Sequence, residues 1–309
     1  MSSDTAPRLP PGTRLSRYTV VGKLAEGGMA EIYLARQQGI AGFSKEIVLK
    51  VIHERYARRH EIIERFRTEA RVAALLNHPN IVHVFDFDMD AGQYFIAMEY
   101  IDGKHLGRLL HALHQQRRRL PRGVGLRIAS DVCAALGYAH RLAGPDRRPL
   151  CLIHRDVSLE NIVLTYSGQV KLLDFGLARA DLSGAHTTGH RLKGKYRYMS
   201  PEMIEGDPID HRIDIYALGI VLYCLVLGRM PFVSKDRAEL LREILGGRPP
   251  RPREVDPGVS PELEGTMLRA LSRDPGARQA SATELQGELE RELRRLDQPV
   301  GSHELSELM

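Results

Sequence analysis

The stretch HRDVSLEN at residues 154–161, followed by LLDFG at residues 172–176, decides how this sequence is interpreted. It brings Asp156, Asn161 and Asp174 into two short segments that flank an apolar, strand-like run. One carboxylate can orient an attacking hydroxyl, and further carboxylate and amide oxygens can hold Mg²⁺ on phosphates. The two segments therefore predict a site for phosphoryl transfer.

Two weaker patterns precede this pair. The stretch LAEGGMAEI at residues 24–32 is a glycine-rich hairpin whose backbone amides could approach phosphate oxygens, although a tight turn would have the same composition. Lys50 ends the apolar stretch IVLK, and Glu69 follows it by nineteen residues in a helical pattern. A buried ammonium needs such a partner, whereas a lysine at a strand edge could extend into solvent.

The composition is that of an ordinary globular chain and excludes a fibrous or disordered protein. The chain has 309 residues, of which 43% are hydrophobic and 27% are charged. Its net charge of 44 − 39 = +5 is too small to indicate a nucleic-acid partner, and none is expected. Cys133, Cys151 and Cys224 form no CxxC pair, so we expect free thiols in a reducing compartment.

Neither end of the chain nor its most apolar run predicts export or membrane insertion. The first fifteen residues lack the apolar core of a secretory signal. The run from Ile215 to Leu227 is shorter than the roughly 20 residues that a membrane-spanning helix needs, so we expect a buried core helix. These observations predict a cytoplasmic protein without a membrane partner.

The pattern of apolar residues changes from strand-like to helical near residue 100. Five β-rich runs and one helical pattern, at residues 61–76, occupy residues 18–100, and long amphipathic patterns follow. The expected organisation is a disordered lead-in (1–15), a strand-rich lobe (16–98), a hinge (99–103), a helical lobe (104–296) and a flexible tail (297–309).

Further motifs complete a resemblance to the bacterial, eukaryotic-like serine/threonine protein kinases over residues 18–295. They are SPE at residues 200–202, DIYALG at residues 214–219, and RDP at residues 273–275 with Arg278 nearby. The resemblance implies an α+β, bilobal protein-kinase fold. A small antiparallel β-rich lobe with one long helix and a larger, mainly helical lobe would enclose an ATP cleft between them.

The resemblance also implies the activity. The chain would transfer the γ-phosphate of ATP, with Mg²⁺ or alternatively Mn²⁺, to serine or threonine hydroxyls of a protein substrate. Lys50 would hold the α- and β-phosphates with Glu69 as its ion-pair partner, Asp156 would orient the substrate hydroxyl, and Asn161 and Asp174 would bind the metal ions.

The nucleotide base would be bound at the hinge. The Glu99 carbonyl and the Ile101 amide would hydrogen-bond adenine behind the gatekeeper Met98, and His105 stands where many kinases place a ribose contact. The residues implied in nucleotide binding are Leu24, Ala25, Glu26, Gly27, Gly28, Met29, Ala30, Glu31, Ile32, Val48, Lys50, Met98, Glu99, Ile101, His105 and Val163.

Other motif residues are expected to have structural or regulatory roles. Glu202 and Arg278 would form a buried ion pair that braces the helical lobe, and His154 would be a packed residue and not a base. Arg155 would pair with a phosphate on the activation segment, at Thr187 or Thr188 with Ser183 as the second candidate. The alternative is a polar threonine pair in a loop.

Several positions depart from the family pattern. Ala25 and Ala30 replace glycines of the loop and would be strained by roughly 1–2 kcal/mol if they needed a left-handed backbone. Val48 stands where the pattern has alanine above adenine. Ser158 replaces a lysine and Lys195 a threonine, so we hypothesise that Lys195 supplies the cation that neutralises γ-phosphate charge. In the alternative, Lys195 points to solvent.

These departures leave other functions open. A pseudokinase that only binds nucleotide is one alternative, and a tyrosine-directed kinase is another. Residues 101–150 are rich in Lys and Arg and include RRR at residues 117–119, which fits the end of an amphipathic helix. The alternative for this basic stretch is an acidic docking partner or nucleic acid.

Overall fold

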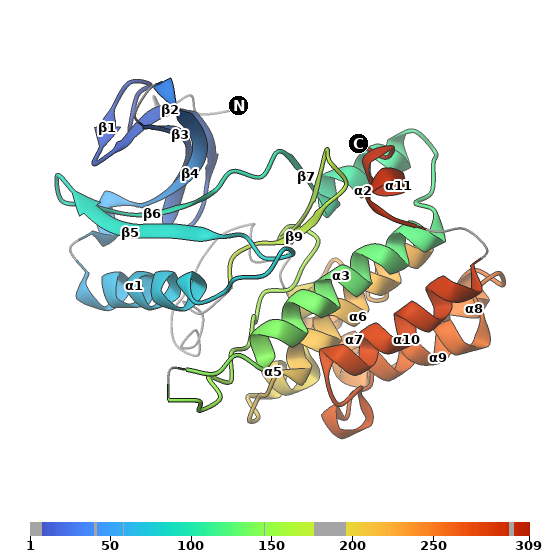
Figure 1. The fold of residues 1–309 in the computed structure, drawn as a ribbon. Coiled ribbons are helices and arrows are strands. Elements are labelled where there is room, and N and C mark those ends of the chain that lie inside the picture. The colour runs from blue at the N-terminus through green and yellow to red at the C-terminus, as the bar shows by residue number, and fades with distance from the viewer. Residues whose placement is uncertain (1–7, 40–41, 58, 145, 176–195, 297–299) are drawn as a thin grey trace. The chain divides into compact units, whose positions relative to one another are not determined.

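The computed structural model describes the chain except for residues 1–7, 40–41, 58, 145, 176–195 and 297–299 (Figure 1). The chain forms two compact units, of which unit 1 comprises Met1–Asn77 and Val82–Ile101, and unit 2 comprises His78–Ile81 and Asp102–Met309. The change from unit 1 to unit 2 after Ile101 falls inside the expected hinge. The assignment of His78–Ile81 to unit 2 was not predicted.

A six-stranded sheet in the order β1-β2-β3-β4-β6-β5 forms unit 1, and all its strand pairs are antiparallel. The sequence predicted five of these strands. Their bounds are β1 (Arg14–Leu15), β2 (Tyr18–Glu26), β3 (Ala30–Gln38), β4 (Ser44–Ile52), β5 (Val84–Asp90) and β6 (Gln93–Glu99).

One face of this sheet carries an apolar core, because side chains alternate between the two faces of a strand. Tyr18 of β2 and Phe95 of β6 are buried there and meet edge to face with ring centroids 5.9 Å apart. Helix α1 (His60–Ala74) packs along β5, after the short 3₁₀ helix η2 (Glu54–Tyr56) (Figure 1). The helix predicted at residues 61–76 is present.

The expectation of a disordered lead-in over residues 1–15 is wrong for its described part. Leu9 and Leu15 are only 5% and 2% exposed and belong to the core of unit 1, and β1 pairs with β2. The prediction rested on the Pro- and Ser-rich composition of the segment and did not consider that its two leucines could pack against the sheet. Residues 1–7 lie outside the described residues.

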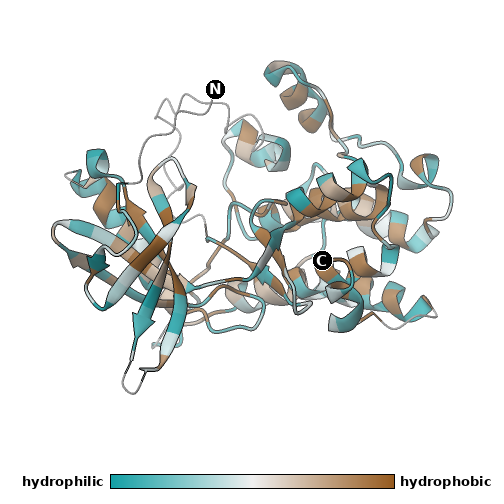
Figure 2. Cartoon of the chain, turned by 90° about the horizontal axis from the view of Figure 1, so that it is seen from above, coloured by the Kyte–Doolittle hydropathy of each residue, from teal (hydrophilic) through white to brown (hydrophobic). Residues whose placement is uncertain are grey.

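Unit 2 is mainly helical and includes a small sheet in the order β7-β8-β9. Many of its hydrophobic residues are buried, and teal and brown stretches alternate along most of its helices in Figure 2. Its elements are β7 (Gly103–His105), α2 (Leu106–Gln115), α3 (Arg122–His140), β8 (Ile162–Thr165), β9 (Val170–Leu172), η4 (Tyr196–Tyr198), α5 (Pro201–Glu205), α6 (Arg212–Leu227), α7 (Arg237–Gly246), α8 (Pro252–Val255), α9 (Pro261–Ala270), η5 (Pro275–Ala277), α10 (Ala282–Arg295) and α11 (Ser302–Ser306).

Helix α6 is the central helix of unit 2. It is buried on all sides from Ile213 to Leu225, which explains why its sequence has no polar face. The run from Ile215 to Leu227 is therefore a core helix, as expected. Among the residues that the structure describes, no helix combines the length and the apolar character needed to cross a membrane.

The flexible tail expected over residues 297–309 is also wrong in its described part. Residues Ser302–Ser306 form α11, and Leu305 in it is 1% exposed. Gly168, in the turn between β8 and β9, has a φ of +76°, and a Cβ added there would collide with the Ser302 carbonyl. A glycine at this turn thus lets the C-terminal segment pack closely against unit 2.

Candidate active site

Among the predicted site residues, those of unit 1 include Lys50. Its Nζ donates to Glu69 Oε1 at 2.7 Å, which joins β4 to α1. The two side chains are only 14% and 12% exposed. The partner expected from the sequence is therefore present, and the Lys50 ammonium is held within the unit and does not extend into solvent.

The glycine-rich hairpin is shorter than the motif suggested. Ala25 lies within β2 and Ala30 begins β3, and neither has a positive φ. The strain considered for these alanines is therefore absent. Gly27 donates its amide to the Ala30 carbonyl at 2.7 Å, and a Cβ added to Gly27 would lie 3.0 Å from that oxygen. Of the three residues 27–29 between the strands, Gly27 is the crowded one.

Strand pairing brings the expected base-binding residues of unit 1 together. Val48 of β4 lies opposite Met98 of β6, and each is 9% exposed. The Glu99 amide donates to the His83 carbonyl at 2.8 Å, which joins the end of β6 to the segment just before β5. Ile101, the last residue of unit 1, is half-buried.

A charged cluster at the base of the hairpin was not predicted. Lys23 donates to Glu26 at 2.8 Å and to Glu31 at 2.6 Å, and Tyr33 donates to Glu31 at 3.0 Å. Burial raises the pKa of Glu31, but these hydrogen bonds outweigh it and lower the pKa below its usual value. The available signal for this cluster was the presence of Lys23, Glu26 and Glu31 within one short hairpin.

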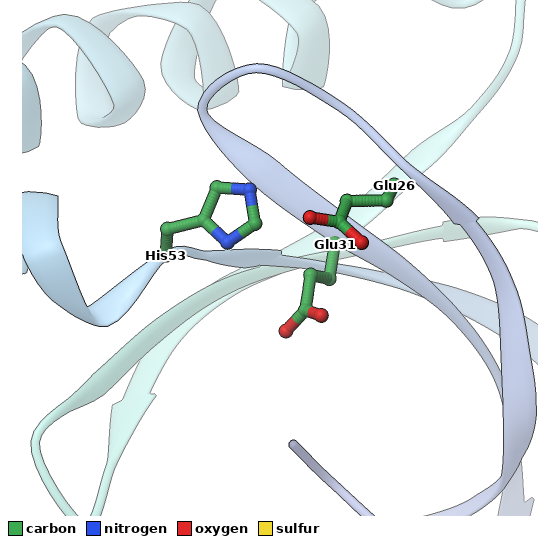
Figure 3. A group of neighbouring side chains, drawn as sticks. All are labelled: Glu26, Glu31 and His53. Atoms are coloured by element: carbon green, nitrogen blue, oxygen red, sulfur yellow. The ribbon is translucent and has the colours of Figure 1, made fainter. Parts of the chain in front are cut away.

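Glu26, Glu31 and His53 also gather their ligand atoms within 4.8 Å of one another (Figure 3). This is the spacing of a potential metal site. The Lys23 ammonium, however, is already paired with both carboxylates. Both carboxylates therefore already have a cationic partner within the protein, and the cluster is not assigned to a metal.

Among the predicted site residues, those of unit 2 include Asp156. The side-chain amide of Asn161 donates to both the backbone oxygen and Oδ2 of Asp156, each at 2.8 Å. These bonds orient the Asp156 carboxylate and leave Oδ1 of Asn161 as the oxygen that can bind a cation. The Leu173 amide donates to the Asn161 carbonyl at 2.8 Å, which links the segment of Asp174 to this loop.

The backbone of this loop is anchored by a buried carboxylate from α6. Asp214 accepts from the amides of His154 and Arg155 at 2.8 Å each and pairs with His140 Nε2 at 2.8 Å. The Asp214 side chain is 1% exposed. Burial raises its pKa, but the His140 hydrogen bond and the nearby charges outweigh burial and lower the pKa below its usual value.

His154 is packed and not placed as a base. It is fully buried, its ring lies 4.6 Å from that of Phe175, and burial lowers its pKa. Its Nδ1 accepts from the Asp156 amide at 3.2 Å, so Nε2 carries the proton and donates to the Leu173 carbonyl at 2.8 Å. A neutral His154 thereby joins the two motifs that the sequence analysis started from.

Two buried polar groups near Asp156 differ from the groups described above in their hydrogen bonding. Within the described residues, the buried Nε of Arg155 and the buried hydroxyl of Ser158 make no hydrogen bond. Arg155 also has a φ of 64°, a conformation that costs energy and is common at functional sites. The expected counterparts Thr187, Thr188 and Lys195, with Ser183, lie outside the described residues.

The remaining predicted residues have clear structural positions. Arg278 donates to both oxygens of Glu202 at 2.6 and 2.8 Å, and its side chain is fully buried. His105 caps α2 by accepting from the Arg108 amide at 3.2 Å. Val163 is buried in β8.

Comparison with known proteins identifies the family. Residues 18–288 match the protein kinase domain, and the chain belongs to this family. It is 40% identical to the tyrosine-protein kinase MasK of Myxococcus xanthus over 86% of its length and 38% identical to the serine/threonine-protein kinase pkn3 of the same organism over 91%. The chain spans only 41% and 51% of these relatives.

Solved structures agree with this assignment. The kinase domain of PknI from Mycobacterium tuberculosis is 32% identical and superimposes with a TM-score of 0.69, covering 93% of this chain and all of that domain. The kinase fold predicted from the motifs is therefore confirmed.

Proposed function

We propose that this chain transfers the γ-phosphate of ATP to serine or threonine hydroxyls of proteins. The observation that carries the proposal is the oriented Asp156 carboxylate, held by Asn161 in a loop whose backbone amides are bound by Asp214. Such a carboxylate can accept a hydrogen bond from a substrate hydroxyl and direct its oxygen toward the phosphate.

ATP and Mg²⁺ are the expected cofactor set. Asn161 Oδ1 and the carboxylate of Asp174 are hard oxygen ligands, which Mg²⁺ prefers, and Mn²⁺ is an alternative with the same ligand chemistry. A bound metal would neutralise phosphate charge, and Lys50, which is paired with Glu69, would bind the phosphates. Val48, Met98, Glu99 and Ile101 would bind adenine.

The exchanged residues Ser158 and Lys195 are part of this proposal. A serine hydroxyl that is buried without a partner in the described residues is consistent with a polar neighbour elsewhere in the chain. Lys195 would supply the cation usually present at the position of Ser158. If the double variant Ser158→Lys with Lys195→Thr is no more active than the two single effects combined, the exchange idea is wrong.

We also propose that the protein is activated by autophosphorylation at Thr187 or Thr188. The hydrogen bonding of the Arg155 guanidinium supports this proposal. This partly unsatisfied guanidinium beside Asp156 is suited to a phosphate, which would form charge-assisted hydrogen bonds. Phosphopeptide mapping of active protein should find one of these threonines modified.

A cytoplasmic location is likewise proposed, on the basis of the three free cysteines.

The decisive experiment measures transfer of label from γ-labelled ATP to a generic basic protein. The Asp156→Asn variant should lose at least about 100-fold in kcat, because the carboxylate is lost while its hydrogen bond to Asn161 can persist. Asp207→Asn, at an exposed loop position after α5, is the matched control and should retain activity. Full activity of Asp156→Asn would contradict the proposed role of this aspartate.

The same assay distinguishes the two other functions. The relative named a tyrosine-protein kinase makes tyrosine the second candidate acceptor, and phosphoamino-acid analysis of the product distinguishes it from serine and threonine. A wild-type protein that binds ATP but transfers no label with Mg²⁺ or Mn²⁺ would be a pseudokinase.

A further inference from the structure

The tip of the glycine-rich hairpin is held by the segment that follows β4. The His53 amide donates to the Met29 carbonyl at 2.9 Å, and Arg55 Nη2 donates to the Gly28 carbonyl at 3.1 Å. His53 Nε2 lies 3.0 Å from the Gly27 carbonyl. Since a carbonyl can only accept, Nε2 must carry the proton. All three carbonyls between β2 and β3 are therefore bound by two neighbouring residues, which we call the loop clasp.

The loop clasp is continuous with the strand that carries Lys50. His53 directly follows Ile52, the last residue of β4, and Ile52 pairs with Ala30 at the start of β3. Lys50 pairs with Ile32 in the same ladder. The clasp therefore fixes the three-residue tip relative to the strand from which the phosphate-binding lysine extends.

A second set of contacts stabilises the base of the same hairpin, where β2 ends and β3 begins. Lys23 bridges Glu26 and Glu31, which lie at the ends of β2 and β3 on either side of the tip, and the His53 ring comes close to both carboxylates (Figure 3). Lys23, Glu26, Glu31, His53 and Arg55 line one open hollow of unit 1. The base and the tip of the hairpin are thus joined in one polar network.

We propose that His53 and Arg55 are positioning residues that hold the glycine-rich loop ready for the phosphates of ATP. A free loop loses conformational entropy when it closes on a ligand, and this cost lowers affinity. A loop whose carbonyls are already hydrogen-bonded is more ordered before binding and therefore loses less conformational entropy when nucleotide binds. The clasp should therefore set nucleotide affinity and leave the chemical step, which depends on Asp156, almost unchanged. This inference rests on the proposed function.

The test compares nucleotide affinity with turnover in His53→Ala and Arg55→Ala. We expect each variant to raise the Kd for a fluorescent N-methylanthraniloyl ATP and the KM for ATP by about 3- to 10-fold, the effect of one lost hydrogen bond. kcat should stay within about twofold of wild type, because no group that touches the reacting atoms changes. Amide hydrogen exchange of residues 24–32 without nucleotide should become faster.

A conservative variant separates positioning from general stability. His53→Gln places an amide nitrogen near the position of Nε2 and should restore most of the affinity lost in His53→Ala. His60→Ala, at the exposed start of α1, removes a nearby histidine outside the clasp and should behave as wild type. Arg55 is exposed, so Arg55→Ala keeps the test available should His53→Ala fail to fold.

Each outcome decides the inference. Unchanged Kd and KM in both alanine variants would overturn it, as would a loss confined to kcat or a His53→Gln variant as weak as His53→Ala. Failure of the proposed function is visible separately, because it would appear in the wild-type protein as binding without transfer. In that case the Kd values and exchange rates still test the clasp. A wild-type protein that binds no nucleotide would overturn both.

Discussion

Two loops that carry predicted site residues, one in each unit, are held in opposite ways. The loop of Asp156 in unit 2 is anchored by Asp214, whose side chain is 1% exposed, and by the fully buried His154. The glycine-rich loop in unit 1 is held by the half-buried His53 and the exposed Arg55. Both sets of anchoring side chains bind backbone groups. Those of the Asp156 loop are buried, whereas those of the glycine-rich loop are accessible to solvent.

This difference in anchoring matches the role that we propose for each loop. A buried charged group that is bound on all sides resists rearrangement, because breaking one contact leaves the others uncompensated. Exposed contacts contribute little individually and can exchange with water. The carboxylate that we propose to orient the reacting hydroxyl is therefore fixed, while the loop that we propose to admit and release nucleotide is held only lightly. The comparison predicts unequal effects of mutation.

The largest effect is expected from the buried anchor. Asp214→Ala removes the acceptor for two backbone amides and the partner of His140, and it should lower the free energy of unfolding by about 3–5 kcal/mol. Transfer activity should fall with it, because the backbone beside Asp156 loses its anchor. Denaturant unfolding followed by circular dichroism measures the stability change. Asp214→Asn, which keeps one acceptor oxygen, should be milder, and a cost below about 1 kcal/mol for Asp214→Ala would remove the contrast between the loops.

Acid should loosen unit 2 before unit 1. Burial lowers the pKa of His78, His105 and His154, all of which lie in unit 2. Each contributes stability above the unfolded pKa of about 6.5, and that stability is lost as the pH falls below it, because the unfolded chain then binds more protons. Unit 2 should lose up to about 1.4 kcal/mol per pH unit for each proton taken up.

Hydrogen exchange measured at about pH 7.5 and pH 5.5, corrected for the intrinsic rates, tests this order. His154→Phe removes the most buried of these groups and should flatten the pH dependence of unit 2. Faster opening of unit 1 at the lower pH would contradict the prediction.

The smallest effect is expected at the tip of the glycine-rich loop. Gly27→Ala places a methyl group 3.0 Å from the Ala30 carbonyl, whereas the space around a Cβ at Gly28 is open. Gly27→Ala should lower the free energy of unfolding by about 1 kcal/mol, and Gly28→Ala by less than about 0.5 kcal/mol. Thermal unfolding of the two variants makes the comparison, and equal shifts would show that the tip is not crowded in the way described.

Local patterns predicted the elements well and their ends poorly. Period-two and helical spacing located the strands from β2 to β6 and helix α1, because backbone geometry repeats over short distances. The lead-in and the tail were misjudged, since Leu9 and Leu305 become buried only when distant segments cover them. Composition alone cannot show such a contact.

The sequence by itself determined which chemical groups the site contains: the lysine, the carboxylates and the asparagine stand in motifs whose spacing is a property of the chain. Only the tertiary structure decided what holds them. Asp214 reaches the amide of His154 from 60 residues away, and His53 reaches the Gly27 carbonyl from 26 residues away. Such partners depend on how strands and helices pack, because hydrogen bonds are short-ranged and their geometry is set after the chain has folded.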